Sequence, residues 1–140
     1  MTSTPTIEQA SAAVDRDLVL AKWLRRLEDP NRRGTYNRLR RFEIGPDCYG
    51  MCAMGELADT FATLGIGRWE GSTYVHEDGT RSAHSLNVST LCKYLKIPSS
   101  QAKDLQDTVV RLNDNGGTIQ DIVDYIRTRL GLPSTDTSNV

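Results

Sequence analysis

The chain has 140 residues and a formal net charge of −1, with 38% hydrophobic and 25% charged residues. This length corresponds to one domain. The composition excludes an intrinsically disordered chain and a membrane protein, because no apolar run approaches about 18 residues. The near-neutral charge excludes a uniformly basic nucleic-acid coat. We expect a single globular domain over residues 1–132 and a flexible C-terminal tail over residues 133–140.

Helical periodicity begins near the N-terminus. Thr6 and Gln9 have the spacing of a capping box. Apolar residues then follow at steps of three or four, the period of one helix face: Ile7, Ala10, Val14, Leu18, Ala21 and Leu24. Pro30 ends this helix, and Asp15 is a second capping residue that would split it in two. Residues 35–44 alternate in the manner of a strand.

A second helix is expected over residues 48–64, as the central helix of the core, because its apolar residues share one face. Gly55 within this helix costs about 1 kcal/mol relative to alanine, so we expect another backbone to approach it closely. The Asp-Gly pair at residues 78–79 lies between two polar alternating runs. It predicts a β-hairpin over residues 72–84.

Three further helices are predicted in the C-terminal half. Their N-cap residues stand just before each apolar run: Asn87, Ser99 or Ser100, and Thr118. Residues 113–117 predict a tight turn before the last helix, and Gly131 ends that helix. These elements predict an α+β fold that is mostly helical, with about five helices and a small antiparallel strand or hairpin element.

The cysteines Cys48, Cys52 and Cys92 make an odd count. The first 20 residues lack the basic-then-apolar order of a signal peptide, so we expect a cytoplasmic protein without a disulfide framework. With His76 and His84 the cysteines supply residue types that bind zinc, but the Cys-x3-Cys spacing has no second pair of ligands. We therefore expect no metal and no other cofactor, with buried thiols and exposed hairpin histidines.

Motifs for common enzymatic chemistry are missing from the sequence, so we expect a protein that is not an enzyme. There is no phosphate-binding Gly-x-x-x-x-Gly-Lys loop and no Gly-x-Ser-x-Gly elbow. The Asn-Asp-Asn-Gly run at residues 113–116 lacks the bidentate glutamate of a calcium loop. The two helices beside this run also have the order of a helix-turn-helix motif. Asp121 and Asp124 would then face phosphate, which favours a packed helical hairpin instead.

The charged residues are unevenly distributed along the chain. Residues 16–41 contain nine Lys and Arg against three acids, whereas residues 42–140 contain eight bases and thirteen acids. This polarity points to an anion or an acidic partner at the basic end of the molecule.

The candidate site lies in this basic segment. Tyr36, Arg38 and Arg40 stand at two-residue steps and would project from one face of the predicted strand. That face would place an aromatic ring for base stacking beside two guanidinium groups for phosphate. Further arginines stand close enough along the chain to contribute: Arg32, Arg33 and Arg41. The alternative is a solvated basic face that pairs with the acidic body of the protein.

Several motifs resemble those of a widespread family of small tailed-phage and prophage proteins of unassigned function. Residues 52–59, Cys-Ala-Met-Gly-Glu-Leu-Ala-Asp, are similar to the family's Cys-Cys-Leu-Gly-Val-Leu-Cys-Asp core. Residues 112–126 are similar to its closing Leu-Asn-Asp-x-Gly-x-Ser-Phe-x-x-Ile-Ala-Asp-x-Ile motif. Two family cysteines are Ala53 and Ala58 here, which argues against an essential cysteine cluster. The resemblance covers about residues 22–130 and implies a phage accessory protein in the host cytoplasm.

Small phage proteins of this class act by binding. By that analogy we expect a non-enzymatic protein that binds an anionic small molecule, a nucleotide-type host immune signal, and sequesters it. The first alternative is a protein that inhibits a host protein with an acidic surface, and the second is a DNA-binding regulator. The sequence also allows a homo-oligomer.

Overall fold

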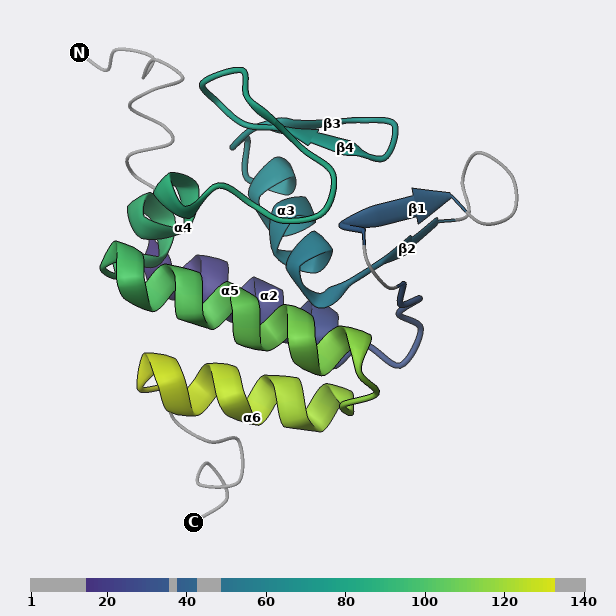
Figure 1. The fold of residues 1–140 in the computed structure, drawn as a ribbon, viewed down its shortest axis with the longest axis vertical. Coiled ribbons are helices and arrows are strands. Elements are labelled where there is room, and N and C mark those ends of the chain that lie inside the picture. The colour runs from purple at the N-terminus through teal and green to yellow at the C-terminus, as the bar shows by residue number, and fades with distance from the viewer. Residues whose placement is uncertain (1–14, 36–37, 43–48, 133–140) are drawn as a thin grey trace, which may run out of the picture.

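A computed structural model of the protein describes residues 15–35, 38–42 and 49–132 (Figure 1). The predicted α+β class is confirmed, because the described residues form five helices and two small antiparallel sheets. In chain order the elements are α2 (Arg16–Leu27), β1 (Arg40–Phe42), β2 (Tyr49–Met51), α3 (Ala53–Thr63), β3 (Arg68–Glu70), β4 (Thr73–Val75), β5 (Arg81–Ser82), α4 (Val88–Leu95), α5 (Ser99–Asp114) and α6 (Ile119–Leu130).

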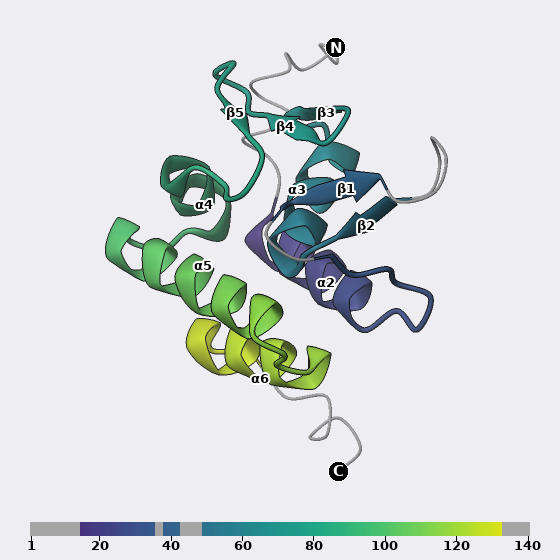
Figure 2. The same cartoon turned by 45° about the vertical axis from the view of Figure 1, so that its right-hand side comes forward.

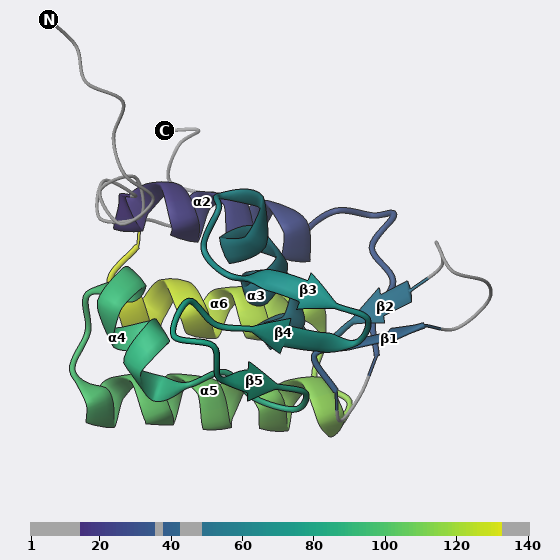
Figure 3. The same ribbon diagram turned by 90° about the horizontal axis from the view of Figure 1, so that it is seen from above.

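Helix α3 is the central element, as the sequence predicts. It packs against α2 and α5, while β2 and β3 contact it from the sheet side (Figures 1 and 2). Met54, Leu57 and Phe61 of α3 are fully buried. Trp23 of α2 is also buried, and its indole Nε1 donates to the carbonyl of Ala53 at 2.9 Å. When the molecule is seen from above, β3 of the three-stranded sheet lies over α3, and β4 and β5 follow it in the direction of α5 (Figure 3).

The close backbone approach expected at Gly55 is confirmed. A Cβ atom built on Gly55 would lie 1.8 Å from the carbonyl oxygen of Leu39. Leu39 itself is buried, and its carbonyl accepts a hydrogen bond from the amide of Cys52 at 3.2 Å. Only a residue without a side chain allows α3 to pass this close to the chain before β1.

The beginning of α3 and the extent of the preceding strand differ from the prediction. Residues 49–51, expected in the helix, form β2 and pair with β1, with Arg40 opposite Met51. The helix begins only after Cys52, whose backbone is extended and whose Sγ accepts from the amide of Gly55 at 3.3 Å. Within the predicted strand 35–44, the described residues form a strand over Arg40–Phe42, which pairs with β2, and residues 36–37 and 43–44 lie outside the described part of the chain.

Only some of the predictions for the two ends of the chain concern residues that the structure describes. Helix α2 begins at Arg16, and the side chain of Asp15 accepts from the amide of Asp17, so Asp15 is an N-cap as predicted. The capping box at Thr6 and the proposed tail over 133–140 lie outside the described residues.

The predicted hairpin is confirmed, but the predicted exposure of one of its histidines is not. Strands β4 and β5 pair across the Asp-Gly turn, with Tyr74 opposite Ser82. The expectation that His76 is exposed is wrong, because only 3% of it is accessible. Its ring nitrogens lie 2.9 Å from the Thr90 hydroxyl and 2.8 Å from the Ser82 hydroxyl, which joins the hairpin to α4. His84 is exposed.

Helices α5 and α6 form an antiparallel pair at one side of the molecule (Figures 1 and 2). Thr118 and Asp121 form a reciprocal capping box, and Gly131 ends α6 with a φ of 68°. The prediction that a tight turn begins at residue 113 is wrong, since α5 continues to Asp114. The N-cap of α5 is Pro98 and not a serine. Asn87 is the N-cap of α4, although its side chain makes no capping bond.

The described residues contain neither a helix that could span a membrane nor a cluster of side chains that could hold a metal ion. No helix among them has the length and apolar character to cross a lipid bilayer. No group of three or more His, Cys, Asp or Glu side chains in these segments is arranged to hold a metal ion. Cys52 is buried, and Cys92 is half-buried. Cys48 lies outside the described residues.

Candidate functional site

The arginines of the predicted site occupy different environments. Arg38 lies in a bend before β1 and lines a pocket, whereas Arg40 is the first residue of β1. The guanidinium carbon of Arg40 lies 4.5 Å from the centroid of the Trp69 ring, a cation–π contact between the two sheets. Arg33 and Arg41 are exposed, and Tyr36 lies outside the described residues. Of these residues, Arg38 lines the pocket described below, and Arg40 is not part of its lining.

Arg32 is held inside the protein by a carboxylate of α3. Its Nε lies 2.7 Å from Glu56 Oε2, and its Nη2 donates to the carbonyl of Met51 at 2.8 Å. Arg26 pairs in the same region with Asp59, which also accepts from the indole Nε1 of Trp69 at 2.9 Å. These ion pairs neutralise part of the basic segment with acids of the body.

Glu56 at the centre of this network is only 4% accessible. Burial raises the pKa of its carboxyl group to about 7, although the charges of Arg32 and Arg26 act in the opposite direction. Loss of hydration therefore outweighs the attraction of the two arginines.

The pocket beside Arg38 has a volume of about 720 Å³. It lies between the C-terminal half of α5, the segment after β5 and the start of α3. Charged groups of both signs, uncharged polar side chains and an apolar surface line it: Arg38, His84, Arg111, Asp107, Asp114, Ser85, Gln106, Asn113, Asn115, Cys52, Met54 and Val110. A volume of this size is typical of small-molecule sites, which range over roughly 300–1,000 Å³.

Two amide side chains in the wall of this pocket are fixed by the backbone. Gln106 accepts from the amide of Leu86 at 2.6 Å and donates to the carbonyl of the same residue at 2.9 Å. Asn113 accepts from the amide of Ala53 at 3.0 Å and donates to the carbonyl of Thr35 at 2.9 Å. Both amides hold the surrounding segments in place, so the pocket has a defined shape.

Arg38 is the unusual member of the lining. Its Nε is buried, and among the described residues it has no hydrogen-bond partner and forms no ion pair. A buried polar atom without a partner costs about 1–3 kcal/mol, and more when the group is charged. An anionic oxygen from a ligand would remove this cost through charge-assisted hydrogen bonds.

The acids of the pocket limit the charge that a ligand can carry. Asp107 is exposed, and Asp114 accepts from the side-chain amide of Asn113 at 3.0 Å. Like charges at close range repel, so these carboxylates disfavour a ligand with several negative charges. Carboxylates also accept hydrogen bonds from amino and hydroxyl groups.

Part of this pocket could not be identified from the basic segment. Arg38 is one of the predicted residues, but Asp107 and Arg111 come from α5. Their spacing of four places both side chains on one helix face, which is a signal in the sequence. Their proximity to Arg38 depends on the fold, because about 70 residues separate them along the chain.

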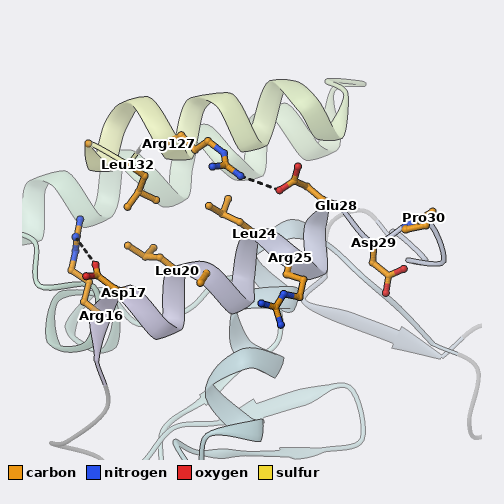
Figure 4. Close-up of a pocket in the computed structure, with 12 residues that line it drawn as sticks. Arg16, Asp17, Leu20, Leu24, Arg25, Glu28, Asp29, Pro30, Arg127 and Leu132 are labelled. Carbon is orange, nitrogen blue, oxygen red and sulfur yellow. Dashed lines mark hydrogen bonds and ion pairs between the residues drawn. The ribbon is translucent and has the colours of Figure 1, made fainter. Parts of the chain in front are cut away.

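A larger hollow, the α2–α6 groove, has a volume of about 1,030 Å³ and is shown in Figure 4. Leu20 and Leu24 of α2 lie in it opposite Leu132. At its edge Arg127 pairs with Glu28 at 3.1 Å. Two of the three arginines in the groove, Arg16 and Arg127, are already bonded to protein acceptors, which makes the groove less suited to a small anion than the Arg38 pocket.

Comparisons with known proteins return no relative. No family model matches the chain, no curated protein is similar to it, and no solved structure matches it. The resemblance to small phage proteins therefore stays a prediction from sequence motifs. The function has to be inferred from the residues of the Arg38 pocket.

Proposed function

We propose that this protein binds a small anionic ligand of nucleotide type in the Arg38 pocket, as a binding protein and not as an enzyme. The observation that supports this most directly is the buried Nε of Arg38, which has no partner among the described residues. A guanidinium group is suited to phosphate, because its planar fork offers two parallel N–H donors.

The other lining residues favour a nucleotide over inorganic phosphate. Met54 and Val110 provide an apolar surface for a ring, and Asp107 and Asp114 can accept from amino or hydroxyl groups. Because these acids disfavour polyphosphates, a phosphodiester with one charge per phosphate fits better. Tyr36 precedes Arg38 by two residues in the sequence, and it is the proposed stacking partner for a base.

In biological terms, we propose that the ligand is a nucleotide-type immune signal of a bacterial host, which the protein sequesters in the host cytoplasm. The motif resemblance to phage accessory proteins supports this role. Sequestration needs affinity and no chemical step, which agrees with the missing enzymatic motifs. A host protein with an acidic surface is the second candidate partner, because Arg33 and Arg41 are exposed.

Mass spectrometry of bound molecules tests this proposal. Wild-type protein and Arg38→Gln are purified from infected host cells and heated, and the released small molecules are analysed without a target list. We expect a phosphate-containing compound from the wild type and roughly tenfold less, or none, from the variant, since one lost charge-assisted contact costs about 1.5–3 kcal/mol. If both proteins instead retain one host protein equally and release no such compound, the inhibitor function replaces this one.

A further inference from the structure

The outer surface of α2 carries an apolar stripe with charges at both ends. Leu18 is 44% accessible and is the one large hydrophobic side chain exposed among the described residues. Ala21, one turn further along, is exposed as well. Asp17 and Arg25 are exposed on either side of them. A single exposed leucine is ordinary on a protein surface, so an interface is indicated here by the groove beside it and by the charges around it.

This stripe borders the α2–α6 groove. Asp17, Ala21 and Arg25 line the groove, whose floor is formed by Leu20 and Leu24 (Figure 4). The two leucines are buried, whereas Leu18 is exposed and is not one of the residues that line the groove. A partner helix lying along α2 would therefore contact a continuous surface of stripe and groove.

The charges of the stripe are symmetric about Ala21. Asp17 precedes Ala21 by four residues and Arg25 follows it by four, so each lies about one helical turn away. An antiparallel copy of α2 related by a two-fold axis at Ala21 would place Asp17 of each copy opposite Arg25 of the other. The same operation brings Leu18 of each copy to the level of Leu24. In a two-fold interface every such contact occurs twice.

The stripe residues are available for these contacts. Arg25 has no hydrogen bond or ion pair in the part of the chain that the structure describes. Asp17 lies 3.6 Å from Arg16, but 77% of the Asp17 side chain is accessible, so this pair contributes little. The small side chain of Ala21 at the centre allows two helices to approach closely.

We propose that α2 and the α2–α6 groove form a two-fold homodimer interface, with Ala21 on the axis. A second copy of this chain is the occupant that the charge pattern fits, since the stripe is complementary to itself. The interface shares no lining residue with the Arg38 pocket, so dimerisation leaves the pocket accessible. The dimer is independent of the proposed ligand.

Sedimentation velocity of the full chain over a range of concentrations tests the interface. The wild type should form a species of twice the 15.6 kDa chain mass. Asp17→Arg and Arg25→Asp should each weaken the dimer by roughly tenfold or more, because each places two like-charge pairs across the axis. The double variant should restore dimerisation, and Lys103→Glu, an exposed reversal on α5, should have no effect.

Cross-linking gives a second readout that needs no charge change. Ala21→Cys should form a disulfide between two copies under mild oxidation, because residues on the axis come within the 4.4–6.8 Å Cα separation that a disulfide typically requires. Lys103→Cys is the matched control and should stay monomeric on a non-reducing gel. A monomeric wild type at all concentrations, or a double variant as weak as the single ones, would overturn the proposal. The groove would then be left to the chain's own N-terminal segment or to another protein.

Discussion

Glu56 is a carboxyl group enclosed by the core, with Arg32 and Arg26 as its charged neighbours. Burial raises its pKa to about 7 in the folded protein, against an ordinary value of 4.5. The folded state therefore binds this proton more tightly than the unfolded state does. Through this group, the free energy of unfolding decreases as the pH rises from about 4.5 to about 7.

We expect Glu56→Gln to remove this decrease, because glutamine does not ionise. Urea denaturation of both proteins at about pH 5, 6 and 7.5 measures the effect. The wild type should gain stability relative to the variant as the pH falls. Comparing the two proteins at each pH cancels the contribution of other groups, such as His76, whose pKa is lowered by burial. A stability difference that does not change with pH would show that Glu56 ionises normally.

Arg32 and Arg38 illustrate how neighbouring arginines acquire different roles. Arg32 lies against a buried carboxylate, and losing one partner of such a pair costs about 3–5 kcal/mol. Arg38 has a buried Nε and no such partner among the described residues. The same residue type therefore contributes to the fold at one position and is available to a ligand at the other.

At the scale of elements, the crossing of α3 with the chain at Leu39 depends on Gly55. Replacing glycine by alanine inside a helix ordinarily stabilises it by about 1 kcal/mol. Here the added Cβ would meet the Leu39 carbonyl oxygen at 1.8 Å. We expect Gly55→Ala to lower the free energy of unfolding by about 1–3 kcal/mol through overpacking. Chemical denaturation measures it.

Thr63→Ala, at an exposed position of the same helix, is the matched control and should stay within about 0.5 kcal/mol of the wild type. A Gly55→Ala protein that is as stable as the wild type, or more stable, would show that α3 and the segment at Leu39 are further apart in solution.

Elements encoded by local signals could be predicted from the sequence. The hairpin at the Asp-Gly turn and the ends of α6 at Thr118 and Gly131 depend on the residues within those turns. Strand β2 could not be predicted, because three residues become a strand only through their pairing with β1. The burial of His76 was also missed, since Thr90 of α4 lies against it only after folding.

In the candidate site, too, only the features encoded by the local sequence could be predicted. The charge distribution indicated the basic segment, and Arg38 within it lines the pocket. The alternation in the predicted strand placed Arg38 and Arg40 together, but the strand begins only at Arg40. The opposite wall, with Asp107 and Arg111, is supplied by α5 and depends on tertiary packing.

At the scale of the whole molecule, two hollows lie on different sets of elements. The α2–α6 groove lies along α2 and α6 and carries the proposed dimer contacts, whereas the Arg38 pocket lies between α5, α3 and the segment after β5. A dimer formed through the groove would carry two separate ligand pockets. Such a dimer would bind two ligand molecules, and sequestration does not require that the two pockets bind cooperatively.

Calorimetric titration of the full chain with inorganic phosphate, a nucleoside monophosphate and a cyclic dinucleotide tests the Arg38 pocket most directly. We expect one of the nucleotides to bind at one site per chain. Arg38→Gln should weaken that binding by roughly tenfold or more, and Arg41→Gln, an exposed arginine of the same segment, should change it by less than about twofold. Equal affinities for wild type and Arg38→Gln, or no binding of any of the three compounds, would contradict the account.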